Sequence, residues 1–151
     1  MRTDRSTADF QWKTNILSNF IPGLDESVMP DQMTLIEMTR EGIPGSTLNK
    51  LAEAFQIPKG EIYHLLHISP KTGQRAVEKR LSKEKSDQLI QIIKVFWKAD
   101  KIFKNHEKAT RWLKSPCFAL GDQIPIQLLD TTEGIDLVTK TLGRIEYGVF
   151  C

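Results

Sequence analysis

Six polar side chains between residues 71 and 80 have the types that proteins use to bind nucleic acid. Gln and Arg can form paired hydrogen bonds with the edges of adenine and guanine, so Gln74 and Arg75 are suited to reading bases. Lysine, arginine and threonine side chains bind phosphate oxygens, which positions a protein on DNA. We therefore predict DNA contacts from Lys71, Thr72, Gln74, Arg75, Lys79 and Arg80.

A helix-turn-helix unit would hold these side chains, because its second helix presents polar residues to the major groove of DNA. The segment from Glu61 to Arg75 has the required plan of an apolar first helix, a tight turn and a second helix. The turn reads Leu-His-Ile-Ser over residues 66–69, and Ser69 is suited to capping a helix that begins at Pro70. This turn resembles that of Xre-type repressors, whose usual form is Leu-Gly-Val-Ser.

Three residues depart from that repressor pattern. His67 replaces the turn glycine, Tyr63 replaces a small residue of the first helix, and Gly73 replaces the apolar anchor of the second helix. Glycine lowers helix propensity by about 1 kcal/mol relative to alanine. Together the departures predict an unusual DNA-reading helix, in which Gly73 lets the backbone approach DNA closely or DNA binding is weak.

A second register of the helix-turn-helix also fits the sequence. Residues 51–62 then supply the first helix and the turn, and Gly60 to Leu66 becomes the recognition helix. That helix has only Lys59 as a basic residue, and Glu61 would face the phosphates. Electrostatics therefore favours the register that ends in the basic residues 71–80.

The second group of candidate residues closes the chain, where an apolar run follows the last predicted helix. The run is Tyr147-Gly148-Val149-Phe150. Terminal residues are usually polar and frayed unless they dock, and an exposed apolar segment commonly marks an interaction site. We expect this run to bind a partner. In the alternative interpretation, Tyr147 and Phe150 fold back on the core of their own domain.

Residues 69–151 resemble the C-terminal toxin-binding domain of the Xre/MbcA/ParS antitoxin family, and the closing GRIEYGVF is the most specific part of this likeness. The resemblance implies an antitoxin of a type II toxin–antitoxin system. Its partner would be a RES-type toxin, which consumes NAD. The resemblance also implies that the protein binds operator DNA and represses its own operon.

Inhibition of such a toxin would be physical occlusion, because enzyme active sites are concave and largely apolar. The other hypothesis is a stand-alone helix-turn-helix transcriptional repressor whose C-terminal half is only a dimerisation domain. The predicted toxin-binding residues are Arg144, Glu146, Tyr147, Gly148, Val149, Phe150 and Cys151.

The spacing of apolar residues and helix caps predicts an all-α fold, with an N-terminal helix-turn-helix domain followed by a small helical toxin-binding domain. We expect a polar arm at residues 1–31, the helix-turn-helix domain at 32–84 and the toxin-binding or dimerisation domain at 85–151. Gly148 is the predicted stop of the last helix. The predicted caps are Ser46, Ser69, Ser86, Asn105 and the capping-box pair Asp130 and Glu133.

The helix predicted from about residue 87 to residue 104 has a wide apolar stripe. The pattern favours a central core helix, and the other interpretation is a contact with a second copy of the chain. We expect a homodimer within a larger toxin–antitoxin complex. The stripe contains Leu89, Ile92, Ile93, Phe96 and Phe103, widened by Ile90 and Trp97.

Charge and composition narrow the remaining function classes. The 151 residues have a net charge of only +2, but the local charge is +4 over residues 69–85, +5 over 94–114 and −3 over 121–151. There is no signal-peptide core and no apolar run of membrane-spanning length, so we expect a cytoplasmic protein without a membrane partner. We find no nucleophile, phosphate-loop or metal-ligand motif and expect no enzyme, catalytic residue, cofactor or metal.

Overall fold

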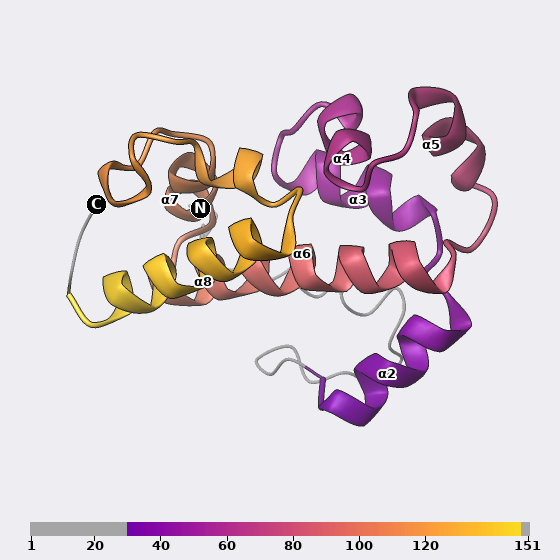
Figure 1. Cartoon of the computed structure of the whole chain (residues 1–151), viewed down its shortest axis with the longest axis horizontal. Helices are drawn as coiled ribbons and strands as arrows, with labels where there is room; N and C mark the ends of the chain where they lie inside the picture. The colour runs from indigo at the N-terminus through magenta and orange to yellow at the C-terminus, as the bar shows by residue number, and fades with distance from the viewer. Residues whose placement is uncertain (1–29, 149–151) are drawn as a thin grey trace, which may run out of the picture. The chain divides into compact units, whose positions relative to one another are not determined.

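The computed structural model describes residues 30–148, and these residues form an all-α fold without a β-strand, as predicted. Most of the predicted arm lies outside this range. The helices, shown in Figure 1, are α2 (Gln32–Glu41), α3 (Ser46–Ala54), α4 (Lys59–Leu65), α5 (Pro70–Ala76), α6 (Lys83–Phe103), α7 (His106–Leu113) and α8 (Thr132–Glu146), with 3-10 helices η1 (Phe118–Leu120) and η2 (Pro125–Leu128).

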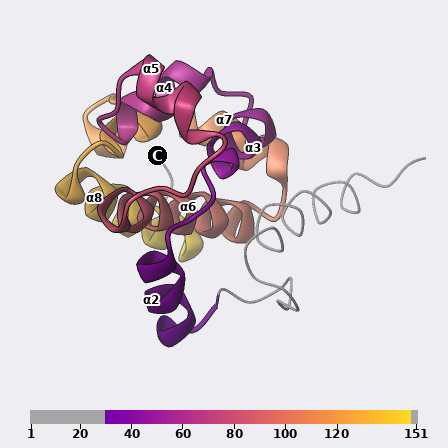
Figure 2. The same ribbon diagram turned by 90° about the vertical axis from the view of Figure 1, so that its right-hand side faces the viewer.

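The chain divides into two compact units, unit 1 up to Ile90 and unit 2 from Gln91, and the division lies within α6. In unit 1, α3, α4 and α5 cluster together, whereas α2 extends away from them (Figures 1 and 2). The carboxylate of Asp31 caps α2 by accepting the Thr34 N–H at 2.8 Å. That backbone hydrogen bond lowers the pKa of the Asp31 carboxyl group.

The core of unit 1 comes from apolar positions spaced along one face of each helix. The segment after α5 returns to the start of α3, where the Gly45 N–H donates to the Lys79 carbonyl at 2.7 Å and the Leu81 N–H to the Ile43 carbonyl at 2.8 Å. These bonds fix the segment that follows α5. The buried core side chains include Ile43, Leu48, Leu51, Phe55, Ile57, Ile62, Leu65 and Leu66.

The core of unit 2 lies between the second half of α6 and the elements that follow it. Both η1 and η2 contact α8, and η2 also contacts α7. The cap of α7 is Asn105, as predicted, and its side chain accepts the Lys108 N–H at 2.9 Å. The buried core side chains include Ile93, Phe96, Ala99, Ala109, Leu113, Ile126, Leu129, Val138 and Leu142.

The prediction that Ser86 caps a helix start is wrong, because α6 begins three residues earlier at Lys83. Ser82 accepts the Lys85 N–H and so takes the capping position. Ser86 is buried within the first turn of α6, where its hydroxyl oxygen accepts the Ile43 N–H at 2.8 Å. It therefore satisfies a buried backbone donor of another segment.

Two further predicted caps are displaced by one residue. Ser46 is the first residue of α3 and not its cap, since Gly45 occupies that position without a side-chain hydrogen bond. In α8 the cap is Thr131 and not Asp130, because the Thr131 hydroxyl accepts the Gly134 N–H at 2.9 Å. At both helix starts a glycine packs closely against a backbone carbonyl, Gly45 against that of Ala76 and Gly134 against that of Leu128.

The apolar stripe of α6 belongs mainly to the core of the chain itself. Leu89, Ile93 and Phe96 are buried. Trp97 is half-buried, and the Lys101 ammonium lies over its ring at 4.9 Å from the centroid. The core interpretation of the stripe is therefore confirmed for these three buried residues. Within residues 30–148, none of the helices combines the length and apolar character that crossing a bilayer requires.

Candidate functional site

Two successive helix pairs in unit 1 have the same turn geometry. After α3, Gln56 adopts a left-handed φ of 54° and the Ile57 N–H donates to the Ala52 carbonyl at 2.8 Å. After α4, His67 adopts a φ of 58° and the Ile68 N–H donates to the Tyr63 carbonyl at 3.0 Å. Both ends are Schellman motifs. Since the backbone supports both registers of the helix-turn-helix, the charges on the second helix distinguish them.

The turn between α4 and α5 lies at residues 66–69, where the sequence places it. Ser69 caps α5 as predicted, since its hydroxyl oxygen accepts the Thr72 N–H at 3.1 Å. His67 stands at a left-handed position. Glycine usually fills such positions, because a side chain there meets the neighbouring backbone. The repressor-like turn is therefore retained, at a conformational cost.

Tyr63 and Gly73 explain each other across the two helices. Tyr63 on α4 is only 4% exposed, and a Cβ atom on Gly73 would lie 2.5 Å from its ring. The tyrosine ring thus fills the space where the repressor pattern has the apolar anchor of the second helix. Gly73 is buried against this ring. The interpretation that Gly73 brings the backbone close to DNA is therefore wrong.

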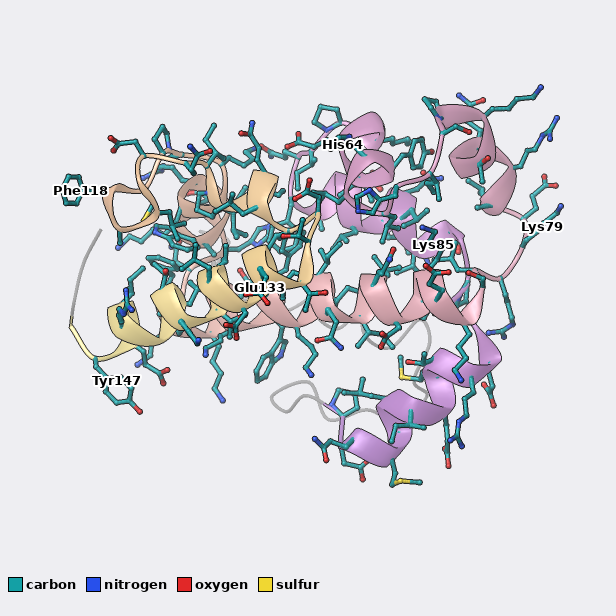
Figure 3. The ribbon with its side chains drawn as sticks, viewed as in Figure 1. His64, Lys79, Lys85, Phe118, Glu133 and Tyr147 are labelled. Carbon is teal, nitrogen blue, oxygen red and sulfur yellow. The ribbon has the colours of Figure 1, made fainter. Side chains whose placement is uncertain are left out.

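The outer face of α5 presents polar side chains to solvent. Lys71, Thr72, Gln74 and Arg75 are all exposed. Lys79, which follows α5, is exposed as well and points away from the helix in Figure 3.

Thr72 is prepared to donate a hydrogen bond. Ser69 donates its hydroxyl hydrogen to Thr72 Oγ1 at 2.9 Å, so the Thr72 hydroxyl hydrogen can turn to an outside acceptor such as a phosphate oxygen.

Two basic residues of the same charged run are engaged within unit 1. Arg80 Nη1 donates to the Gly42 carbonyl at 2.6 Å, and Lys85 Nζ donates to the Leu66 carbonyl at 2.7 Å. Arg80 therefore fastens the segment after α5, and Lys85 supports the end of α4. The sequence predicted Arg80 as a phosphate contact, and nothing in the charge pattern distinguishes it from Lys79.

The end of α8 in unit 2 exposes a second candidate site. Tyr147 is the C-cap of α8 and is 86% exposed, so it does not fold back on the core of its domain. Gly148 has a φ of +90° and its N–H donates to the Ile145 carbonyl at 3.0 Å, which turns the chain off the helix as predicted. Arg144 and Glu146 are also exposed. The predicted toxin-binding residues Val149, Phe150 and Cys151 lie outside the described residues.

Phe118 on η1 is a candidate that the sequence analysis does not include. Its side chain is 81% exposed, although phenylalanine is usually buried. Figure 3 shows Phe118 and Tyr147 projecting outward at the same end of unit 2. No local signal in the sequence distinguishes Phe118 from Leu120, because both are apolar residues of the same short turn.

His106 and Asp100 form a structural pair in unit 2. His106 Nδ1 lies 3.1 Å from a carboxylate oxygen of Asp100, and the Asp100 side chain is fully buried. This contact ties the start of α7 to α6. Among the described residues, no group of three or more metal-binding side chains comes together.

Comparison with known proteins follows the division into two units. Residues 34–94 match the family model of the antitoxin Xre-like helix-turn-helix domain. Residues 98–148 match that of the antitoxin Xre/MbcA/ParS C-terminal toxin-binding domain. The chain belongs to the Xre/MbcA/ParS antitoxins.

Curated relatives carry antitoxin names and match across both domains. The chain is 29% identical over 119 residues to Antitoxin Xre of Yersinia enterocolitica, covering 77% of this chain and 80% of the relative. It is 28% identical to Antitoxin Xre of Photorhabdus laumondii, covering 72% and 76%. It is 27% identical to the Prs ADP-ribosylating antitoxin of a Sphingobium strain, covering 76% and 79%.

Each candidate site lies within one of the two matched domains. α4, α5 and the basic residues after them lie within the helix-turn-helix match. Phe118 and Tyr147 lie within the toxin-binding match, which ends at residue 148. The antitoxin therefore separates a basic polar surface in one domain from an aromatic surface in the other.

Proposed function

We propose that this antitoxin neutralises a RES-type, NAD-degrading toxin by inserting its C-terminal tail into the toxin's active site. The tail comprises Arg144, Glu146, Tyr147, Gly148, Val149, Phe150 and Cys151. The observation that carries the proposal is the exposure of Tyr147, at the end of α8 and within the toxin-binding domain.

The chemistry of the tail suits an enzyme pocket, which is concave and largely apolar with a few polar groups. Tyr147 supplies a rigid ring and a hydroxyl group, and Gly148 ends the helix with a positive φ. Burying Val149 and Phe150 contributes about 1.5–3 kcal/mol each before ordering costs are subtracted. In this proposal Arg144, which is exposed, pairs with an acidic group of the toxin.

The name of the Sphingobium relative supports the choice of NAD as the toxin's substrate. ADP-ribosylation transfers a group from NAD, so an antitoxin named for it points to a partner that binds NAD. We propose that the toxin partner of the present chain likewise uses NAD. A cytoplasmic location is part of the proposal, because both the proposed toxin substrate and the proposed operator DNA are found there.

The test uses the purified toxin encoded next to this antitoxin's gene and measures NAD consumption. Full-length antitoxin should stop NAD loss, and a variant truncated after Glu146 should restore it. The truncated variant should still bind the toxin, because α8 and the rest of unit 2 remain. If the truncated variant inhibits as well as the intact antitoxin, the tail does not occlude the active site.

We further propose that α5 binds operator DNA and that the antitoxin represses its own operon. The exposed side chains Lys71, Arg75 and Lys79 support this proposal, because they are available to phosphates and bases. A gel shift with the antitoxin's own promoter tests it. Binding without any toxin partner in the neighbouring genes would favour the alternative, a stand-alone repressor with a C-terminal dimerisation domain.

A homodimer is part of this proposal, since two recognition helices about 34 Å apart would match one turn of DNA. The buried side chains of α6, Leu89, Ile93 and Phe96, are used within the chain and leave the contact to another surface. Light scattering at micromolar concentration tests the assembly. A monomer, both alone and in complex with the toxin, would contradict it.

A further inference from the structure

The loop that carries Phe118 is closed by its own backbone. The Cys117 N–H donates to the Gln123 carbonyl at 3.0 Å, and the Asp122 N–H donates back to the Cys117 carbonyl at 3.0 Å. Gly121 and Asp122 both adopt left-handed φ values, near 65°, which the tight turn requires. The backbone at Phe118 is thus held in a defined position, so little backbone conformational entropy is lost when the side chain docks.

The loop turns one apolar side chain inward and the other outward. Leu120 is buried, whereas Phe118, two residues earlier, faces solvent. An exposed phenyl ring adds nothing to the stability of unit 2, because burial and not mere presence of apolar surface stabilises a fold. An exposed aromatic side chain on an ordered backbone is typical of the anchors that dominate protein–protein affinity.

Phe118 lies within the part of the chain that matches the toxin-binding domain. η1 contacts α8, so the loop adjoins the helix that leads to Tyr147. Asp122 in the same loop and the pair Arg144 and Glu146 near the end of α8 are exposed as well.

We propose that Phe118 is a second anchor for the toxin, seated in an apolar depression of the toxin outside its NAD pocket. This inference rests on the proposed function, in which unit 2 binds the toxin. The two anchors divide the work: Phe118 holds the complex together, and the tail excludes the substrate. Removing either anchor should therefore change a different measured quantity.

The experiment measures the dissociation constant and the residual NAD consumption for Phe118→Ala with the purified toxin encoded next to the antitoxin gene. The dissociation constant should rise about tenfold or more, mainly through faster dissociation. At saturating concentration, Phe118→Ala should still inhibit fully, since its tail is intact. The truncation after Glu146 should show the reverse: binding within about tenfold of wild type and lost inhibition.

Matched controls separate this role from general damage. Met33→Ala removes an exposed apolar side chain from unit 1 and should leave the affinity for the toxin unchanged. Phe118→Tyr keeps the ring and should bind within about threefold of wild type. The melting temperature of Phe118→Ala should equal that of the wild type, because the side chain packs on little of its own domain.

Three outcomes distinguish the claims. Wild-type affinity for Phe118→Ala overturns the second anchor and leaves tail occlusion intact. Weaker binding by Phe118→Ala, together with full inhibition by the truncated variant, supports the anchor and overturns occlusion by the tail. A change in the molecular mass of free Phe118→Ala would assign the side chain to a contact between two copies of the antitoxin and overturn the proposal.

Discussion

The helix that carries the basic side chains and the helix that leads to Tyr147 are both docked through a glycine. A Cβ atom on Gly45 would collide with the backbone carbonyl of Ala76 at the end of α5. A Cβ atom on Gly134 would likewise collide with the carbonyl of Leu128, beside the start of α8. Both functional elements are therefore held by close backbone contact, which leaves their outer side chains free for partners.

The two regions differ in what they expose. α5 presents charged and amide side chains, which suit a polyanion that is read through hydrogen bonds. Unit 2 presents Phe118 and Tyr147, which suit an apolar protein pocket. The unusual residues of α4 and α5, Tyr63 and Gly73, are buried against each other. The unusual residues of unit 2, Phe118 and Tyr147, face solvent.

The largest expected effect on stability concerns the packing of the Tyr63 ring against Gly73. Tyr63→Ala should destabilise the protein by about 3–5 kcal/mol, because it leaves a cavity between α4 and α5. Gly73→Leu alone should cost about 1–3 kcal/mol through collision with the Tyr63 ring. The double variant should recover most of the loss in urea unfolding. Simple addition of the two losses would show that the ring does not replace the missing anchor.

The docking glycines should damage one region at a time. Gly134→Ala should destabilise the protein by about 3 kcal/mol, weaken toxin binding and leave DNA binding intact. Gly45→Ala should also destabilise the protein, but it should weaken DNA binding and leave toxin binding intact, since it displaces α5. Thermal unfolding combined with both binding assays measures this. Equal damage to both activities by either variant would contradict the independence of the two regions.

DNA binding should respond to single side chains on the α5 face. Arg75→Ala should cost about 1–3 kcal/mol on the operator and relax specificity at one base position. Lys79→Ala should weaken binding to all sequences and reduce the slope of affinity against salt by about one. Lys140→Ala in unit 2 is the charge-matched control. Wild-type gel shifts for both variants across a salt series would show that this register is wrong.

The smallest expected effect concerns the left-handed turn residue. His67→Gly should stabilise the protein by about 1 kcal/mol, since glycine adopts a φ of 58° without a steric penalty. His64→Gly, on the neighbouring exposed helical position, should instead destabilise it by about 1 kcal/mol. Urea unfolding compares the two variants. A loss of stability for His67→Gly would mean that its side chain contributes more than the backbone costs.

The local signals that the sequence predicts correctly are those that a few neighbouring residues decide. Ser69 before Pro70 and Asn105 before α7 are the only nearby residues suited to capping, and both caps are confirmed. Ser86 was misassigned because Ser82 competes for the same helix start, and a distant backbone N–H of Ile43 draws Ser86 into the core.

The missed features depend on packing between elements. Tyr63 and Gly73 are ten residues apart on different helices, so their compensation follows only from the crossing of α4 and α5. Arg80 and Lys79 look alike in the charge pattern, but only Arg80 reaches the Gly42 carbonyl. Which of Phe118 and Leu120 faces solvent depends on how the η1 turn docks on α8.

The most direct test of the account is the NAD dependence of inhibition. If the tail occupies the NAD pocket, the antitoxin concentration that halves toxin activity should rise in proportion to the NAD concentration once NAD exceeds its KM. The initial rate of NAD loss, measured over a series of NAD and antitoxin concentrations, gives this dependence. Competitive inhibition by the intact antitoxin is the predicted result. Inhibition that is independent of NAD concentration would contradict occlusion and place the inhibitory contact elsewhere on unit 2.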